Sequence, residues 1–167
     1  MQKSTYLCKN LLIMTKHKTI ALVAHDNRKQ ALMEWVEYNY DILKEHKLVC
    51  TGTTGKYVEA AIAKNLKDDE EMKFPIIKLK SGPLGGDQML GSMIAEGKID
   101  YLIFLWDPMQ PQPHDVDVKA LNRIAVLYNI PIANNRATAD FIITSSLFGS
   151  NYQPILTDYS SYTNRNI

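Results

Sequence analysis

Cysteine is scarce in this sequence, and metal-binding patterns are missing. The two cysteines, Cys8 and Cys50, lie far apart, and neither belongs to a C-x-x-C pair or to a cluster with histidine. Isolated cysteines of this kind are typical of free thiols in a reducing compartment. The four histidines likewise show no metal-ligand spacing with cysteines or carboxylates. The sequence therefore predicts neither a structural disulfide nor a metal centre.

Long apolar runs and an excess of one charge are also missing. No run approaches the roughly 18 apolar residues of a membrane-spanning helix. Residues 11–14 (LLIM) are too few for the core of a signal peptide. The formal net charge is +1 and no stretch is densely basic, so charge gives no reason to expect a nucleic-acid partner. We expect a cytoplasmic protein that binds neither membrane nor nucleic acid.

The chain has the size and composition of one globular domain. Its 167 residues are 46% hydrophobic and 22% charged, which is enough apolar material for a core. Residues 1–17 show no sustained period and are predicted to form an N-terminal tail, so that the domain spans residues 18–167. Within it, residues 65–73 (NLKDDEEMK) form a charged run that is expected at the surface.

Apolar runs of strand length alternate with helical patterns five times. The runs cover residues 19–24, 48–50, 74–79, 100–106 and 130–133. Helical spacing follows each run, at residues 26–44, around 57–64, 88–96, 118–128 and 138–146. Continuously apolar strands alternating with helices predict an α/β fold: a single-domain, doubly wound, three-layer α/β/α sandwich with a mostly parallel, about five-stranded sheet. A further edge strand is expected near Ile155.

A glycine-rich stretch, residues 81–88 (SGPLGGDQ), separates the third strand from its helix. Such a turn exposes backbone N–H groups, and the start of the following helix adds a positive dipole end, so an anion could bind there. Asp87 brings a carboxylate to the same place. Because a carboxylate does not bind phosphate, Asp87 is a candidate base.

Polar residues follow every predicted strand. They are His25 with Asp26, residues 51–55 (TGTTG), Ser81 to Asp87, Asp107, and Asn134 with Asn135, and His114 and Asp117 come shortly after the fourth strand. Ligands of parallel sheets bind beyond the carboxyl ends of the strands. Taken singly, an Asp or Asn here is usually a turn former or a cap, and TGTTG lacks the lysine of a P-loop. The convergence of all five is the stronger signal.

Four side chains have a structural alternative at this point. His25 could equally be a structural hydrogen-bonding residue, and Lys29, one turn further along, would by default be a solvated lysine. Trp35 and Trp106 are expected in the core.

Two chemistries suit a phosphate cradle that also holds carboxylates and a histidine. Phosphoryl transfer usually needs magnesium and a lysine clamp. Proton abstraction beside a carbonyl needs a carboxylate base and a histidine that polarises the oxygen. The residues at hand favour the second.

Five motifs occur in one order: AHD-x-x-K at 24–29, TGTTG at 51–55, SGPLGGDQ at 81–88, WDP at 106–108 and PHD-x-D at 113–117. Together they resemble the methylglyoxal synthases over about residues 18–162. The resemblance implies conversion of dihydroxyacetone phosphate to methylglyoxal and inorganic phosphate, without metal or organic cofactor. It also implies a homohexamer that phosphate inhibits.

The resemblance assigns a role to each matching position. Asp87 is similar to the base, His114 to the group that hydrogen-bonds substrate oxygens and shuttles protons, and His25 to a substrate contact. The implied phosphate cradle consists of Lys29, Thr51, Gly52, Thr53, Thr54, Ser81 and Gly82. Asp26, Asp107 and Asp117 match carboxylates that orient the site.

Two departures stand out. Segment 65–73 is longer than the pattern leads us to expect, and Arg165 is one position out of register with an arginine that the family uses to reach phosphate, so that role is not transferred.

Two other functions are compatible with the same pattern. The fold also serves as a non-catalytic, effector-binding regulatory module in larger proteins such as carbamoyl phosphate synthetase. A triose-phosphate isomerase would use the same proton abstraction but would keep the phosphate from leaving. The presence of both Asp87 and His114 favours the enzyme over the module.

Overall fold

A computed structural model describes residues 17–66, 75–111, 113 and 115–164 of the protein. Four predictions fall wholly or largely outside these residues: the tail 1–17, most of the charged segment 65–73, His114 and Arg165.

A five-stranded parallel sheet forms the centre of the molecule. Its strands are β1 (Thr19–Ala24), β2 (Lys47–Cys50), β3 (Ile76–Lys78), β4 (Tyr101–Leu105) and β5 (Ile132–Ala133). They lie in the order β3-β2-β1-β4-β5, and every pair is parallel. The strand order therefore reverses between β1 and β4, as the predicted doubly wound fold requires.

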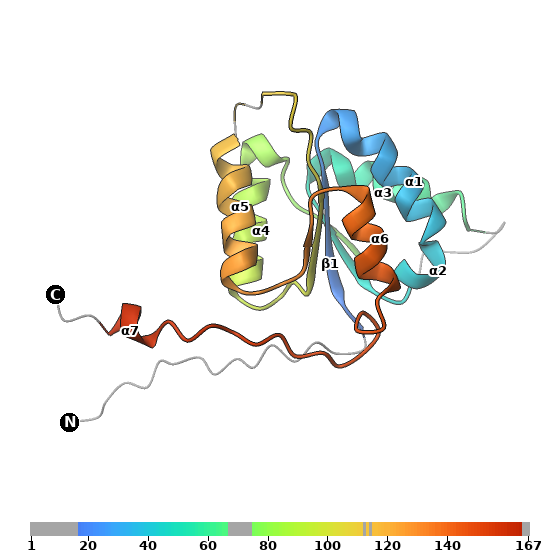
Figure 1. Cartoon of the computed structure of the whole chain (residues 1–167). Coiled ribbons are helices and arrows are strands. Elements are labelled where there is room, and N and C mark those ends of the chain that lie inside the picture. The colour runs from blue at the N-terminus through green and yellow to red at the C-terminus, as the bar shows by residue number, and fades with distance from the viewer. Residues whose placement is uncertain (1–16, 67–74, 112, 114, 165–167) are drawn as a thin grey trace.

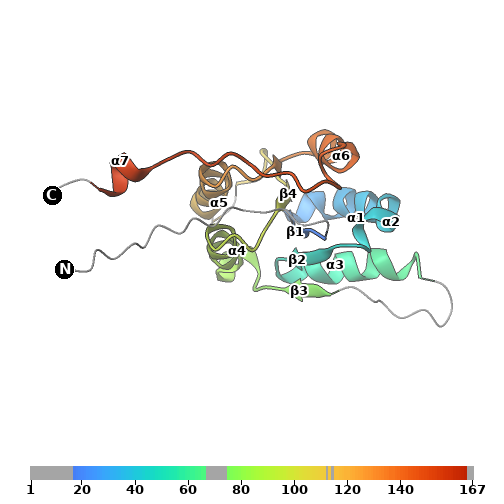
Figure 2. The ribbon, with the colours of Figure 1, turned by 90° about the horizontal axis from the view of Figure 1, so that it is seen from below.

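Helices cover both faces of the sheet, which gives the three predicted layers (Figures 1 and 2). One face carries α1 (Lys29–Tyr38), α2 (Tyr40–Leu43), α3 (Gly52–Ala63) and α6 (Arg136–Thr144). The other carries α4 (Gly86–Ala95) and α5 (Asp115–Leu127). Strand β1 serves both cores, because Ile20 and Leu22 pack toward the first layer while Ala21 and Val23 pack toward the second. None of the helices among the described residues is long and apolar enough to cross a membrane.

The helix predicted over residues 26–44 is broken into three pieces. A 3-10 helix, η1 (Asp26–Arg28), precedes α1, and Asn39 separates α1 from α2. The side-chain amide of Asn39 donates to the carbonyl of Trp35 at 2.8 Å, which is the competition with backbone bonding that makes asparagine a poor helix former. Asp26 and Asn27 precede α1, but neither side chain caps it, since neither bonds the helix start.

Two further expectations fail near the ends of elements. No strand forms at Ile155, which is 86% exposed. Its carbonyl accepts from the Asn129 side chain at 2.9 Å, and the chain continues as an extended arm to the short helix α7 (Ser160–Thr163). Trp106 is 38% exposed because β4 ends one residue earlier, whereas Trp35 is in the core as predicted.

Candidate active site

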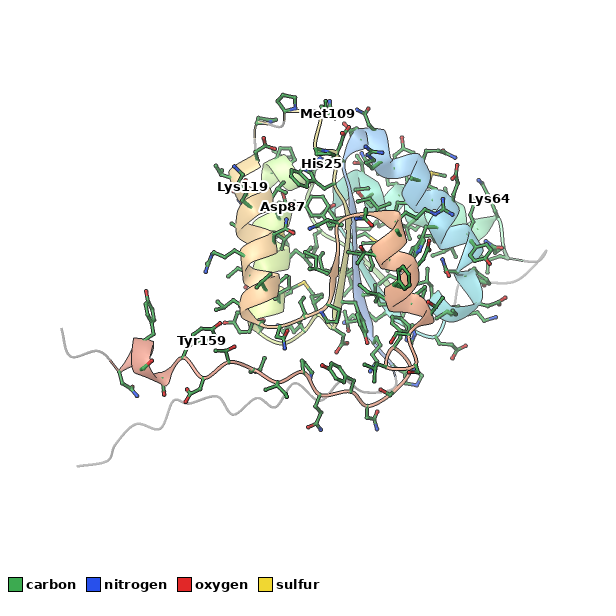
Figure 3. The ribbon with its side chains drawn as sticks, in the orientation of Figure 1. His25, Lys64, Asp87, Met109, Lys119 and Tyr159 are labelled. Carbon is green, nitrogen blue, oxygen red and sulfur yellow. The ribbon has the colours of Figure 1, made fainter. Side chains whose placement is uncertain are left out.

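A cavity of about 250 Å³ opens at the carboxyl ends of the strands. It brings together most of the residues that the sequence singled out, and Figure 3 shows His25 and Asp87 near this end of the sheet. The lining consists of Val23, Ala24, His25, Asp26, Lys29, Thr51, Thr53, Thr54, Ser81, Gly82, Pro83, Asp87 and Phe104. The segments after β1, β2 and β3 and the end of β4 all contribute, so the sheet itself assembles the site.

The TGTTG motif forms one wall of this cavity. The sequence predicted a helix only around residues 57–64, but Thr51 is the N-cap and α3 already begins at Gly52. The first turn of a helix presents backbone N–H groups and a positive dipole end, which suits an anion better than an irregular loop. A Cβ on Gly52 would lie 2.7 Å from Ser81 Cα. Glycine therefore lets the start of α3 and the segment after β3 approach each other.

Lys29 is built into the cavity and is not a solvated surface lysine. Its side chain is only 12% exposed. Its Nζ donates to Thr53 Oγ1 at 2.6 Å and to Asp26 Oδ1 at 2.5 Å, and it lies 5.4 Å from the centre of the Tyr57 ring. The hydrogen bond and the charge of Lys29 hold the pKa of Asp26 below its usual value. Asp26 itself is 82% exposed, so it lies at the mouth and pairs with the lysine.

Asp87 is held by a tight turn after β3 and lines the same cavity. The 3-10 helix η2 (Gly82–Leu84) leads into α4, whose first turn contains Asp87. A Cβ on Gly86 would lie 2.1 Å from the carbonyl oxygen of Lys80, and the Gly86 N–H donates to the Ser81 carbonyl at 2.9 Å. Only glycine fits there, and α4 begins two residues earlier than predicted. The Asp87 side chain is thereby placed in the cavity wall although the residue is only 3% exposed.

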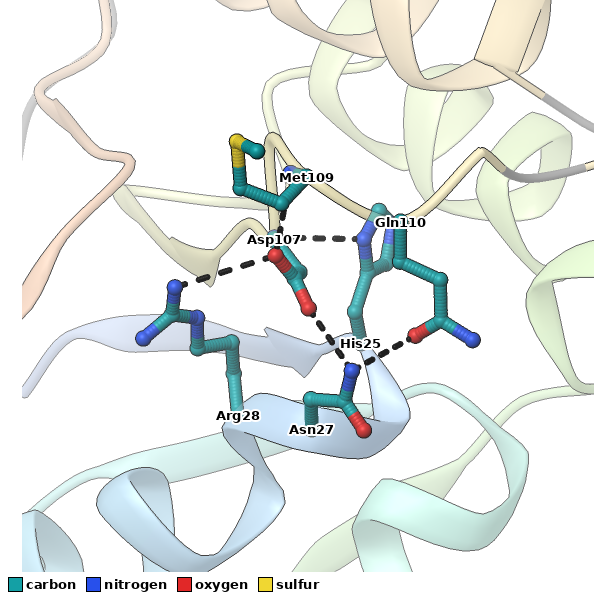
Figure 4. Close-up of polar contacts among 6 residues, drawn as sticks. All are labelled: His25, Asn27, Arg28, Asp107, Met109 and Gln110. Carbon is teal, nitrogen blue, oxygen red and sulfur yellow. Dashed lines mark hydrogen bonds and ion pairs between the residues drawn. The ribbon is translucent and has the colours of Figure 1, made fainter.

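Asp107 contacts His25 and does not line the cavity. Its backbone N–H donates to His25 Nδ1 at 3.2 Å. Its carboxylate accepts from Asn27 Nδ2 at 2.9 Å and from the Met109 N–H at 3.1 Å (Figure 4). The bond from Asn27, followed by that from Met109, keeps the pKa of Asp107 below its usual value. Asp107 therefore meets the cavity only through its contact with His25.

Asp117 lies outside the cavity as well. It lines a separate groove of about 330 Å³ between α4 and α5, and this groove shares Asp87 with the cavity. The sequence predicted Asp117 near the other candidate residues. The structure places it in a groove that also contains Asp87, but not in the cavity itself. Within residues 17–66, 75–111, 113 and 115–164, no three His, Cys, Asp or Glu side chains gather as metal ligands would.

Known proteins share both the sequence and the fold. A family model described as an MGS-like domain matches residues 31–134. The methylglyoxal synthase of Maridesulfovibrio salexigens is 60% identical, over 92% of this chain and 100% of that protein. That of Oleidesulfovibrio alaskensis is 51% identical, over 91% of this chain and 97% of that protein.

A solved structure agrees with these sequence matches. The crystal structure of methylglyoxal synthase from Elizabethkingia anophelis NUHP1 superposes with a TM-score of 0.79 at 49% identity, covering 92% of this chain and 95% of that one. With a matching family model and relatives at this identity over nearly its whole length, the chain belongs to the methylglyoxal synthase family.

Proposed function

We propose that this protein converts dihydroxyacetone phosphate to methylglyoxal and inorganic phosphate. The observation that carries the proposal is that a buried carboxylate, Asp87, and the threonine-rich start of α3 line the same cavity. The cavity volume of about 250 Å³ is below the roughly 300–1,000 Å³ typical of sites for drug-sized ligands. A triose phosphate is a substrate of fitting size.

The phosphate group is assigned to the wall built by α3. The hydroxyl of Thr53 and the ammonium of Lys29 are already hydrogen-bonded to each other at 2.6 Å, so they form one preassembled donor pair. The hydroxyls of Thr51 and Thr54 lie 3.5 Å apart and are buried next to it. Backbone N–H groups at the helix start complete a site for a dianion.

Proton abstraction is assigned to Asp87. Its carboxylate takes a proton from the hydroxymethyl carbon of the substrate, and an enediol phosphate forms while His25, and His114 by resemblance, hydrogen-bond the substrate oxygens. The hydroxyl on the deprotonated carbon then loses its proton as a C=O bond forms there. The double bond shifts, the C–O bond to phosphate breaks, and its electron pair leaves with the phosphate. The remaining enol takes up a proton at its terminal carbon and becomes methylglyoxal.

Product analysis separates this proposal from the two alternatives. Incubation with dihydroxyacetone phosphate should release inorganic phosphate and methylglyoxal in equal amounts, measured by a colorimetric phosphate assay and by derivatisation of the dicarbonyl. Glyceraldehyde 3-phosphate without phosphate release would indicate an isomerase. Binding without turnover would indicate a regulatory module. EDTA should leave the rate unchanged, because none of the assigned steps uses a metal ion.

The proposal also covers the oligomeric state of the protein, its inhibition by phosphate and its location in the cell. We propose a cytoplasmic homohexamer that inorganic phosphate inhibits. The hexamer is inferred from the family resemblance, and the product phosphate suits the cradle assigned to the substrate. Light scattering should give six copies. Added phosphate should raise KM, and a sigmoidal response would show coupling between copies.

A further inference from the structure

The segments after β1 and β4 are bonded to each other at the point where the strand order reverses. The His25 N–H donates to the Leu105 carbonyl at 3.2 Å, and the Asp107 N–H donates to His25 Nδ1 at 3.2 Å. The ring of His25 also packs edge-on against Phe104, with the ring centres 5.2 Å apart. The position of the His25 ring thus depends on where residues 106–110 lie.

Asn27 holds that segment from the β1 side. Its side-chain amide donates to Asp107 Oδ2 at 2.9 Å and to Gln110 Oε1 at 2.9 Å (Figure 4). The other carboxylate oxygen, Oδ1, accepts from the Met109 N–H at 3.1 Å and lies 3.7 Å from Arg28 Nη2. Asn27 is therefore the residue that bonds both ends of the 107–110 turn at once.

These contacts decide which nitrogen of His25 carries a proton. Nδ1 accepts the Asp107 N–H and must be unprotonated, so a neutral ring has its proton on Nε2. A histidine in this tautomer can donate from Nε2 to a substrate oxygen. If the 107–110 turn shifted, the bond to Nδ1 would weaken and the other tautomer would become accessible.

We propose that Asn27 is a positioning residue for the reaction, which holds the 107–110 turn against His25 and thereby fixes the Nε2–H tautomer of that histidine. The inference rests on the proposed function, in which His25 contacts the substrate. Two observations favour this positioning role over the alternative that Asn27 is simply a solvent-exposed asparagine. The Asn27 side chain caps no helix, and its hydrogen bond is the largest cause of the lowered pKa of Asp107.

The first test is Asn27→Ala, with Asn65→Ala as the matched control. Asn65 is also an exposed asparagine, but it follows the far end of α3, where its side-chain amide donates to the carbonyls of Glu37 and Ala61 at 3.4 Å. For Asn27→Ala we expect kcat to fall about 10- to 100-fold, as for other residues that orient a reacting group. KM should change little because the phosphate cradle is untouched, and Tm should stay near that of the parent protein because the residue is exposed. Asn65→Ala should match the parent protein in all three.

The second test is Asn27→Asp, which keeps the shape but places a second carboxylate against Asp107. Two carboxylates at this distance raise the pKa of one of them, so at low pH a shared proton can restore a hydrogen bond to Asp107. The ratio of variant to parent kcat should therefore rise as the pH falls. A role limited to filling space would leave this ratio independent of pH.

The third test observes the tautomer directly and needs no substrate. In protein labelled with 15N-histidine, long-range proton–nitrogen correlations report which ring nitrogen is protonated, and His25→Gln identifies the signals of His25. We expect the Nε2–H form in the parent protein and in Asn65→Ala, and a mixture of tautomers in Asn27→Ala. A protein that turned over no dihydroxyacetone phosphate would refute the proposed function while leaving this reading intact. An unchanged His25 tautomer in Asn27→Ala, or parent-like kcat in that variant, would overturn the positioning role.

Discussion

The two ends of the sheet bury polar side chains in different ways. At the amino end, Lys18 Nζ donates to the Ser150 carbonyl at 2.7 Å and the Lys18 N–H donates to His46 Nδ1 at 3.2 Å. The Thr19 N–H donates to Asp100 Oδ2 at 2.7 Å. At the carboxyl end, by contrast, buried residues such as Thr54 and Asp87 border a cavity of about 250 Å³. Buried polar side chains alone therefore do not indicate a ligand-binding site. Buried polar side chains that border an open cavity do.

Aromatic packing closes the amino end. Phe148 is 5% exposed and packs against the rings of His46, at 5.3 Å, and Tyr101, at 4.8 Å. Burial lowers the pKa of His46 and of Lys18 and raises that of Asp100. At this end, lysine and histidine side chains do not border a cavity. They hold the segment after α6 against the sheet, through Ser150 and Phe148. We therefore expect changes at the carboxyl end to affect turnover and changes at the amino end to affect stability.

Asp87→Asn should give the largest effect on turnover. The variant keeps the shape of the side chain but removes the base, so kcat should fall by about 10²–10⁴, the usual contribution of general-base catalysis. The affinity for inorganic phosphate, measured by calorimetry, should stay the same or improve because a negative charge near the dianion is lost. Tm should not fall. Turnover near the parent rate would assign the base to another carboxylate.

Phe148→Ala should give the reverse pattern at the other end. Truncating a buried phenylalanine typically costs about 3–5 kcal/mol of unfolding free energy. Each kcal/mol shifts Tm by about 2–4 °C in a domain of this size. Thermal unfolding should show this drop, while kcat measured well below Tm should match the parent protein. A large loss of kcat in the folded variant would show that the two ends are coupled.

Thr53→Ala combined with Thr54→Ala should weaken phosphate binding without removing the base. The lost hydrogen bonds to a charged group are worth roughly 1–3 kcal/mol, or about 5- to 150-fold in Kd. Calorimetry with inorganic phosphate measures this change. Thr144→Ala, which removes an exposed hydroxyl of α6 bonded to the Asp140 carbonyl at 2.7 Å, is the matched control and should leave Kd unchanged. Equal losses in both variants would contradict the assignment of the cradle.

The smallest expected effect is a pH dependence of stability that comes from His46. Burial, with the nearby charges of His17 and Lys18, lowers the pKa of His46 from its usual 6.5. Its neutral form is favoured in the folded state, so this stabilisation is complete above pH 6.5 and is lost as the pH falls through the folded pKa. His46→Asn keeps an acceptor for the Lys18 N–H but does not titrate. Between about pH 7.5 and about pH 5.5, Tm should fall more in the parent protein than in the variant, and parallel curves would contradict this reading.

The fold and most of the site could be predicted because they depend on local patterns. Continuous apolar runs alternating with helical spacing specify a parallel sheet, and a parallel sheet brings the residues after its strands to one edge. The cavity accordingly contains His25, Lys29 and Asp87, as predicted.

What escaped prediction depends on contacts between distant residues. The bond from Asn27 to Asp107 joins positions 80 residues apart, and nothing in the local sequence of Asn27 distinguishes it from a helix cap. The burial of Lys18 could not be predicted from the sequence either. Lysine is usually exposed, and the acceptor of its ammonium group is the carbonyl of Ser150, 132 residues away. Trp106 was assigned to the core because its exposure depends on the exact end of β4.

The most direct test of the central claim is to run the reaction in D₂O and locate the deuterium in the product. If a carbon-bound proton is removed in the cavity before phosphate leaves, the parent protein should form methylglyoxal with one deuterium in its methyl group, together with an equal amount of inorganic phosphate. Asp87→Asn should give neither product at a comparable rate. Deuterium in glyceraldehyde 3-phosphate without phosphate release, or equal labelling by Asp87→Asn, would contradict the account.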